Sequence, residues 1–247
     1  MKKYYKITNK EECHYGMEYK NGLNIDILPF DPTGPCCPGG IYFADKENIC
    51  KFLNYGCFIR EVVIPGDALI YHENNKSKAD KVILKERRDL SKVETWQWMI
   101  EEGIDIYIRD TVKDNKCLLY AMSNGHTAIV QFLINNGVNF CNYDFLCCIE
   151  YGYTEIAKLL LDHGVDKISC KNSALCIASE YGYKEIVKLL LDYGADNPGH
   201  ALQYAASHDH TEIVSLLLNH GADDNAICNA LDIASKYGHK ATVNLLL

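Results

Sequence analysis

One phrase recurs through the second half of this 247-residue chain and limits what the chain can fold into. It reads Gly-His/Tyr-x-x-Ile-x-x-Leu-Leu-Leu-x-x-Gly-Ala-Asp. It begins at Gly125, Gly152, Gly182, Gly238 and also at Asp209, where an aspartate replaces the glycine. The starts lie 27, 30, 27 and 29 residues apart, a period typical of repeat architectures. A unit of this size cannot bury its own apolar face, so we expect consecutive copies to stack.

The apolar residues inside each copy predict a helix. An isoleucine stands three to five residues before an apolar triplet, which places both on one helical face. A glycine follows each triplet, where a helix C-terminus favours a residue that adopts positive φ. The isoleucines are Ile129, Ile156, Ile186 and Ile213, and the glycines are Gly137, Gly164, Gly194 and Gly221.

A second, shorter helix is predicted before each starting glycine. Its expected ranges are 118–124, 145–151, 175–181, 202–208 and 231–237. A small residue recurs at one position of these segments, where only a small side chain lets two antiparallel helices approach closely. The small residues are Ala121, Cys148, Ala178, Ala205 and Ala234.

The phrases from Gly182 to Asp196 and from Ala201 to Ala206 resemble the ankyrin repeat, and the resemblance covers about residues 90–247. It implies an α-solenoid over residues 89–247 with about five and a half repeats, beginning with Glu94–Asp105 and ending in a truncated last repeat. These repeats run 27–30 residues rather than 33 and lack the Thr-Pro-Leu-His opening. The missing residues fall before the first helix, so we expect shortened or absent β-turn fingers.

The resemblance also implies a binding surface, because the two residues before the helix-joining glycine face the concave groove in ankyrin proteins. Tyrosine is favoured at protein interfaces, so we predict partner binding here. The alternative that these rings only cover the helix joint stays open. The predicted partner-binding residues are Glu150, Tyr151, Glu180, Tyr181, Ser207, His208, Lys236 and Tyr237, with Ser123 and Asn124 at the first joint. A second column is predicted to form structural hydrogen bonds rather than to bind metal: His126, Tyr153, Tyr183, His210 and His239.

Residues 1–88 predict a separate small α+β domain of unknown function. Short β-rich runs, Ile41–Phe43 and Phe58–Ile64, are broken by Pro/Gly-rich turns, and a short helix is expected up to Leu53. The segment 74–88 mixes six basic residues with acidic ones, which predicts a solvated face rather than a phosphate-binding patch.

Three kinds of chemistry are conceivable for this N-terminal region, and the residues favour none of them. The stretch 39–68 faintly resembles ADP-ribosyltransferase-like domains, in which Tyr42 would stack on nicotinamide, but no catalytic glutamate can be placed. A loop thiol, Cys36 or Cys37, with His14 as base is a weak nucleophile candidate. A zinc site lacks regular ligand spacing; its candidate ligands would be Cys13, His14, Cys36, Cys37, Cys50 and Cys57.

The composition of the chain disfavours several classes of ligand and location. With 33 acidic and 25 basic residues the net charge is −8, which disfavours nucleic acid as a ligand. No run approaches the roughly 20 apolar residues of a membrane span, and the N-terminus lacks a signal-peptide pattern. The 12 cysteines are expected to be free thiols in an intracellular protein that is not secreted.

The whole chain resembles the short-repeat ankyrin proteins of giant DNA viruses, which implies a host-facing role in the host cytoplasm. We therefore predict a protein-binding scaffold without catalytic residues, cofactor, metal, nucleic acid or membrane contact. The partner's identity stays open. The degenerate or active ADP-ribosyltransferase-like domain, targeted by the repeats, is the alternative. Leu245, Leu246 and Leu247 suggest self-association through an uncapped C-terminal end.

Overall fold

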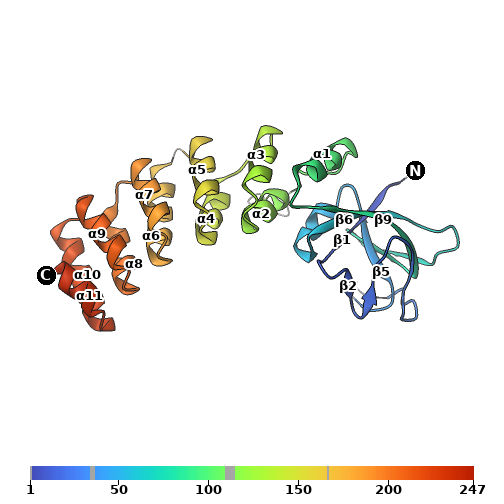
Figure 1. Cartoon of the computed structure of the whole chain (residues 1–247), viewed down its shortest axis with the longest axis horizontal. Helices are drawn as coiled ribbons and strands as arrows, with labels where there is room; N and C mark the ends of the chain where they lie inside the picture. Colours follow the sequence, from blue (N-terminus) through green and yellow to red (C-terminus); the bar gives the residue numbers. More distant parts are fainter. Residues whose placement is uncertain (1, 34–36, 109–114, 166) are drawn as a thin grey trace. The chain divides into compact units, whose positions relative to one another are not determined.

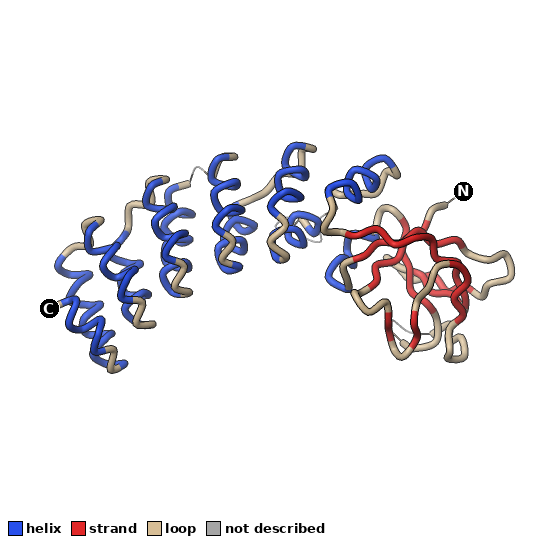
Figure 2. The backbone as a smooth tube through the Cα atoms, in the orientation of Figure 1, coloured by secondary structure: helices blue, strands red, loops and turns tan. Residues whose placement is uncertain are grey.

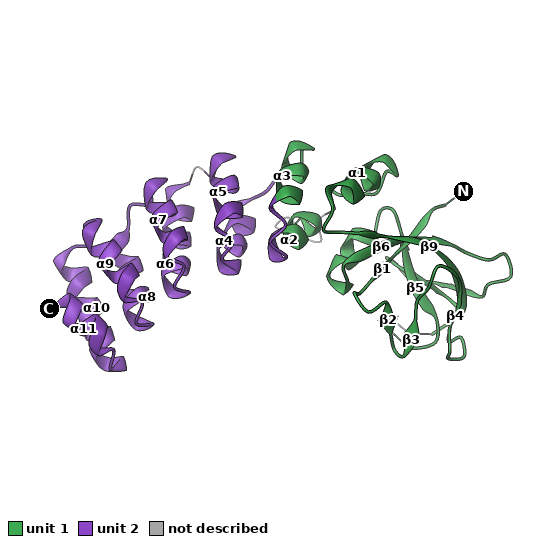
Figure 3. Cartoon of the chain, in the orientation of Figure 1, with its two compact units in different colours: residues 1–121, 128–139 green, residues 122–127, 140–247 purple. Residues whose placement is uncertain are grey.

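A computed structural model describes residues 2–33, 37–108, 115–165 and 167–247. The chain divides into two compact units (Figure 3). Unit 1 holds residues 1–121 and 128–139, and unit 2 holds residues 122–127 and 140–247. A mainly antiparallel β region therefore comes first, followed by the helix pairs (Figures 1 and 2).

Unit 1 is built on a seven-stranded antiparallel sheet with the order β4-β9-β6-β1-β5-β8-β7. Strands β2 and β3 form a separate hairpin. The strands are β1 (Tyr4–Thr8), β2 (Cys13–His14), β3 (Met17–Glu18), β4 (Gly22–Ile25), β5 (Ile41–Asp45), β6 (Phe58–Val63), β7 (Ile70–His72), β8 (Ser77–Ala79) and β9 (Lys81–Asp89). The two strands predicted from β-rich runs, at 41–43 and 58–64, are confirmed as β5 and β6.

The segment expected to form a short helix up to Leu53 is a 3₁₀ helix, η1 (Ile49–Tyr55). It lies against β1 and β5 and buries Ile49, Cys50 and Leu53. Apolar side chains from the sheet, Ile41, Phe43, Val62 and Leu84 among them, form a compact core.

Unit 1 also contains α1 (Val93–Glu101), most of α2 (Lys116–Ser123) and α3 (Thr127–Asn135) from residue 128 onward. Helix α1 contacts the sheet directly, because the Trp98 ring packs edge-on against Tyr5 of β1 at 5.9 Å between centroids. Glu102, just after α1, accepts a hydrogen bond from the Tyr5 hydroxyl and pairs with Lys3. The boundary predicted at residue 88 therefore passes between elements that pack together, and independent folding on either side of it stays a prediction.

Unit 2 continues the helix pairs as two layers. Helices α4, α6, α8 and α10 follow one another in one layer, and α5, α7, α9 and α11 follow one another in the second. Their bounds are α4 (Asn142–Tyr151), α5 (Thr154–Asp162), α6 (Ile168–Glu180), α7 (Lys184–Asp192), α8 (Pro198–Ser207), α9 (Thr211–Asn219), α10 (Asp224–Tyr237) and α11 (Lys240–Leu246).

The first helix of each pair is longer than its apolar pattern predicted. Helix α6 begins at Ile168, seven residues before the expected start, and α10 begins at Asp224, also seven residues early. At α10 the reason is a cap, because the Asp223 side chain accepts the Ala226 N–H. No strand occurs within 140–165 or 167–247, so the helix begins where a β-turn finger would otherwise lie.

The small residues predicted at the helix contact are all fully buried. Cys148, Ala178, Ala205 and Ala234 are 0% exposed in unit 2, and Ala121 is 0% exposed in unit 1. The isoleucines of the second helices are also buried. The small-residue expectation is therefore confirmed.

Helix α11 exposes part of its apolar side. Leu246 is buried, whereas Leu245 is 40% and Leu247 is 87% exposed. None of the described helices combines the length and apolar character that crossing a bilayer requires.

Candidate functional site

The predicted binding residues lie at the ends of α4, α6, α8 and α10, immediately before each helix joint. Their aromatic members are exposed: Tyr151 by 39%, Tyr181 by 53% and Tyr237 by 60%, and His208 is exposed as well. We call Tyr151, Tyr181, His208 and Tyr237 the outer row. Of their neighbours, Glu150 and Lys236 are exposed, while Glu180 and Ser207 are half-buried.

Two residues after each outer-row ring stands a second ring, and these form the inner row: Tyr153, Tyr183, His210 and His239. Inner-row side chains bond to the carbonyl oxygens of the preceding repeat. The Tyr183 hydroxyl donates to Glu150 O at 3.3 Å, and Nε2 of His210 and of His239 lies 3.0 Å from Glu180 O and 3.1 Å from Ser207 O. The predicted structural role is confirmed for these three side chains.

The joint glycines leave room for the inner row. A Cβ on Gly152 would lie 2.7 Å from the Tyr183 ring, and one on Gly182 would lie 2.8 Å from the His210 ring. Both glycines also have positive φ, which side-chain-bearing residues adopt at a cost. The rings of Tyr183 and His210 therefore rest on the backbone of the preceding joint, where a side chain would clash, and Tyr153 rests on Gly125 in the same way. The joint that precedes His239 carries Asp209 instead of glycine.

The two rows stack on one another in three of the repeats. Ring centroids lie 5.8 Å apart for Tyr181 and Tyr183, 6.0 Å for His208 and His210, and 5.9 Å for Tyr237 and His239. Interplanar angles of 12°, 11° and 25° make all three pairs stacked. We call the two rows together the aromatic ladder. Hydrogen bonds hold Tyr183, His210 and His239 of the inner row, so these side chains fix the orientation of the exposed rings stacked on them.

The protonation state of Tyr151 and the charged residues beside the rings determine the chemistry of this surface. Burial, together with the negative charge of Glu150 and nearby thiols, raises the pKa of Tyr151, so its hydroxyl stays protonated at neutral pH and remains a donor. Lys236 lies 5.9 Å from the Tyr237 ring centroid. The first joint has Ser123 and Asn124 in place of a ring. The ladder can therefore offer flat apolar faces and hydroxyl donors, with carboxylates beside its first two rings.

Replacing Gly152 with alanine tests whether the contact between the Tyr183 ring and this joint stabilises the fold. The new Cβ clashes with Tyr183 and strains the backbone, so we expect a loss of about 2–4 kcal/mol in the free energy of unfolding. Gly194→Ala is the matched control, because Gly194 has a similar positive φ but nothing within 4 Å of its Cβ. The control should lose only about 1–2 kcal/mol, the backbone cost alone. Equal losses in denaturant titrations would contradict the role of the ring contact.

A comparison with known protein families matches ankyrin repeats over three overlapping stretches, residues 88–169, 145–200 and 175–247. Together they cover well over half of the chain. The chain belongs to the ankyrin repeat family. Ankyrin repeats are generally protein-binding, so protein partners are the general expectation for this chain.

Similar proteins come from Acanthamoeba polyphaga mimivirus. The ankyrin repeat protein R868 is 33% identical over 171 residues, covering 64% of this chain and 82% of that protein. The ankyrin repeat protein R896 is 38% identical over 148 residues, covering 57% of this chain and 43% of R896. The uncharacterized protein R869 is 38% identical over 140 residues, 54% of this chain and 99% of R869. The resemblance to viral ankyrin proteins is thereby confirmed.

The N-terminal candidates of this ankyrin repeat protein lie in unit 1. Tyr42 lines a pocket of about 160 Å³. Cys37 and His14 line a smaller neighbouring cavity together, while Cys36 lies outside the described residues. No three His, Cys, Asp or Glu residues gather as metal ligands anywhere in the described ranges. Nor does a disulfide join the cysteines that the structure describes.

The prediction that residues 74–88 form a solvated face is confirmed only in part. Residues 85–88 are exposed, but Lys78 is 0% exposed and its Nζ lies 5.5 Å from the Tyr42 ring centroid. The expectation was wrong for Lys78 because strand β8 turns that side chain inward. Sequence reasoning also missed Lys6 and Lys76, which line the Tyr42 pocket.

Proposed function

We propose that the chain is a protein-binding adaptor that holds its partner on the outer row of the aromatic ladder. The observation that carries this proposal is the combination of exposed outer rings with inner rings fixed by hydrogen bonds. Rigid aromatic side chains lose little conformational entropy on binding, which favours affinity. A ladder that only covered the joints would need the inner row alone.

The chemistry of the surface indicates the kind of partner. Glu150 and Glu180 stand beside Tyr151 and Tyr181, and the chain has a net charge of −8. A partner surface with basic and hydrogen-bonding side chains is complementary to that charge. Because the similar proteins are viral, we place the interaction in the cytoplasm of a host cell.

Affinity purification with quantitative mass spectrometry tests this proposal. The combined variant Tyr151→Ala, Tyr181→Ala and Tyr237→Ala should recover its specific partner at least about tenfold less, a loss of about 1.4 kcal/mol or more. Tyr143→Ala is the matched control, because Tyr143 is 48% exposed on α4 but lies outside the ladder. An unchanged partner set in the combined variant, with its fold intact by circular dichroism, would refute the ladder as the binding surface.

We also propose that the chain acts by binding rather than by catalysis. The ADP-ribosyltransferase-like alternative places Tyr42 against nicotinamide, and Tyr42 does line a pocket. That pocket, however, has no aspartate or glutamate among its described lining residues. We therefore expect NAD at about 1 mM to leave the melting temperature unchanged. A saturable upward shift would revive the transferase alternative.

Self-association is a second proposed contact, through the exposed Leu245 of α11 and Leu247 just after that helix. Leu246 is buried, so Leu246→Glu would disturb packing as well as the surface. Leu247→Glu changes an 87% exposed side chain and tests the contact alone. If copies associate through this end, light scattering at rising concentration should show oligomers for the wild type and monomers for the variant. Identical monomers in both would reject the contact.

A further inference from the structure

The pocket in unit 1 differs from the aromatic ladder in its residues and in its chemistry. It has a volume of about 160 Å³, and side chains from β1, β5, η1 and the β2–β3 hairpin line it. A cavity of about 150 Å³ holds one benzene ring, so this pocket suits a ligand with a single ring. Its lining includes the rings of Tyr15, Tyr19, Tyr42, Phe43, Phe52 and Tyr55.

Lys6 is the unusual member of this lining. It is only 7% exposed, although lysine is almost never fully buried without a partner. Its Nζ donates to Tyr42 O at 3.0 Å and lies 4.5 Å from the Tyr19 ring centroid. A lysine side chain can donate up to three hydrogen bonds, and among the described residues the Tyr42 oxygen accepts one. Lys6 therefore brings an amine with spare capacity to the wall of the pocket.

The other lysine of the lining is engaged within the protein. Lys76 Nζ lies 3.7 Å from Glu73 Oε2, so this carboxylate balances its charge. The same Nζ lies 4.3 Å from the Tyr42 ring centroid. We therefore assign the contact with a ligand to Lys6 and not to Lys76.

The surroundings of Lys6 increase its neutral fraction. Burial lowers the pKa of Lys6 to about 8, against the attraction of Asp26 and Glu12. Both carboxylates are bound elsewhere, Asp26 by the Gly40 N–H at 2.6 Å and Glu12 by Arg60. At about pH 7.5 roughly a quarter of the Lys6 amines are then neutral, against about 0.1% for an exposed lysine. A neutral amine has the lone pair that an ammonium ion lacks, so it can react as a nucleophile.

We propose that Lys6 captures a small aromatic aldehyde in this pocket as an imine. The ring lies among the aromatic walls, where it can stack or pack edge-on. Nζ of the neutral amine attacks the aldehyde carbon, and the carbinolamine that forms then loses water. The nitrogen gives up both hydrogens of that water and the aldehyde supplies its oxygen, so a C=N bond replaces the C=O bond. The step needs no oxidant or reductant and reverses when water adds to the imine.

Reductive trapping on the wild-type full chain tests the proposal. The chain is incubated with benzaldehyde and cyanoborohydride at about pH 7.5, and peptide mass spectrometry quantifies the modified lysines. Lys85 is the matched control, because it is exposed on β9 outside the pocket. We expect Lys6 to be labelled at least about tenfold faster than Lys85, as its larger neutral fraction predicts. Excess benzyl alcohol, which has the ring but no electrophilic carbon, should slow labelling at Lys6 and leave Lys85 unaffected.

Two further measurements separate capture of an aromatic aldehyde from simple amine reactivity. With propanal, which has no ring, the preference for Lys6 over Lys85 should be smaller than with benzaldehyde. Lys6→Arg keeps a positive charge but removes the primary amine, so the imine absorbance seen when salicylaldehyde is added should fall.

Four outcomes would overturn the proposal. These are labelling of Lys6 no faster than of Lys85, no protection by benzyl alcohol, an equal preference for Lys6 with propanal, and an unchanged imine absorbance in Lys6→Arg. If Lys6→Arg does not fold, the labelling of the wild type decides alone, because it needs no variant.

Discussion

Replacing Arg60 with methionine is expected to lower the free energy of unfolding by about 3–5 kcal/mol. Arg60 lies on β6 and is 3% exposed. Its guanidinium contacts both carboxylate oxygens of Glu12, with Nε 3.1 Å from Oε1 and a second contact from Nη2 to Oε2. Methionine fills much of the same volume but leaves the Glu12 carboxylate buried without its cation. An unpaired buried charge is among the most costly defects a fold can contain.

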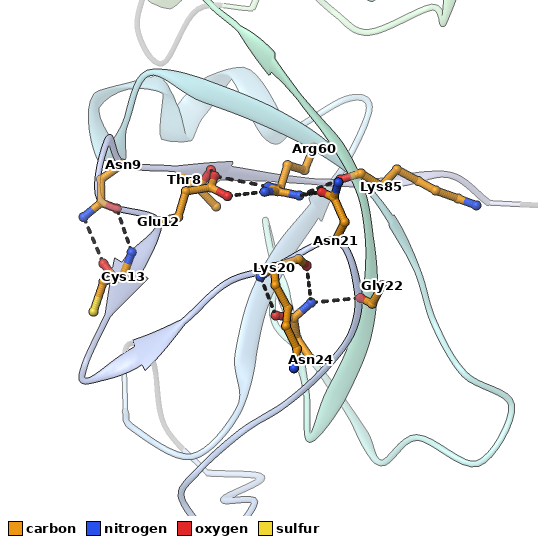
Figure 4. A network of polar contacts seen from close by, with 10 residues as sticks. All are labelled: Thr8, Asn9, Glu12, Cys13, Lys20, Asn21, Gly22, Asn24, Arg60 and Lys85. Carbon is orange, nitrogen blue, oxygen red and sulfur yellow. Dashed lines mark hydrogen bonds and ion pairs between the residues drawn. The ribbon is translucent and has the colours of Figure 1, made fainter.

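The network around this ion pair connects segments that are distant in sequence (Figure 4). Nη1 of Arg60 donates to the Asn21 side chain and to the Lys85 carbonyl oxygen, both at 2.7 Å. Thr8 donates to Glu12 as well. In the same region Asn9 bonds to the backbone of Cys13, and Asn24 bonds to Lys20 and Gly22 (Figure 4). Arg60 therefore connects β1, β6, β9 and the loop before β4.

Urea titrations followed by tryptophan fluorescence measure the free energy of unfolding that Arg60→Met loses, since both tryptophans lie in unit 1. Arg87→Met is the control, because Arg87 is exposed, packs on the Phe58 ring and attracts Glu12 more weakly than Arg60 does, and it should lose less than about 1 kcal/mol. The double variant Glu12→Gln with Arg60→Met should recover part of the loss, since no charge remains unpaired. A double variant as unstable as Arg60→Met would show that the charge is not the cause.

The pair of Glu12 and Arg60 also predicts how the free energy of unfolding depends on pH. Burial alone would raise the pKa of Glu12, but hydrogen bonds from Arg60 and Thr8 and the charge of Arg60 outweigh it and hold the pKa below the usual 4.5. A carboxyl whose pKa is lower in the folded state stabilises the fold above the unfolded pKa. That stability is lost as the pH falls from 4.5 through the lowered value. Glu12→Gln should therefore flatten the acid limb of the stability curve, and an unchanged limb would contradict the assignment.

The repeats could be predicted from sequence because their determinants are local. Each helix carries its own apolar face, and every joint except that of Asp209 carries its own glycine, so positions such as Ala178 and Ile186 are identified by recurrence alone. The early start of α6 was missed because the predicted start relied on apolar residues, and Ile168–Ser173 is a mixed segment. Stacking of Tyr181 on Tyr183 was also missed, since a spacing of two residues across a joint depends on the turn geometry there.

The N-terminal region was predicted less fully because its determinants are long-range. Glu12 and Arg60 are 48 residues apart, and no sequence pattern pairs them. Lys6 and Lys78 read as ordinary surface lysines, and only the sheet topology brings both beside Tyr42. The strand order interleaves β1 between β5 and β6, so neighbours in space are not neighbours in sequence.

Replacing Trp96 with alanine is the second change with a large expected effect, a loss of about 3–5 kcal/mol in the free energy of unfolding. Trp96 lies on α1 and is 0% exposed. Its indole Nε1 donates to Leu90 O at 2.9 Å, and its ring lies 6.2 Å from that of Tyr120 on α2. Alanine would leave a large cavity and one unpaired buried carbonyl.

Trp98 supplies the matched control on the same helix. It is half-buried, packing on Tyr5 with Arg88 4.4 Å from its ring, so Trp98→Ala should lose only about 1–2 kcal/mol. Each variant keeps one tryptophan as the fluorescent probe of unit 1. The two rings contact different elements, Trp96 reaching α2 and Trp98 reaching β1, so together they join the first helix to both neighbours. If Trp96→Ala cost no more than Trp98→Ala, the contact of α1 with α2 would contribute little, and the sheet alone would hold α1 in place.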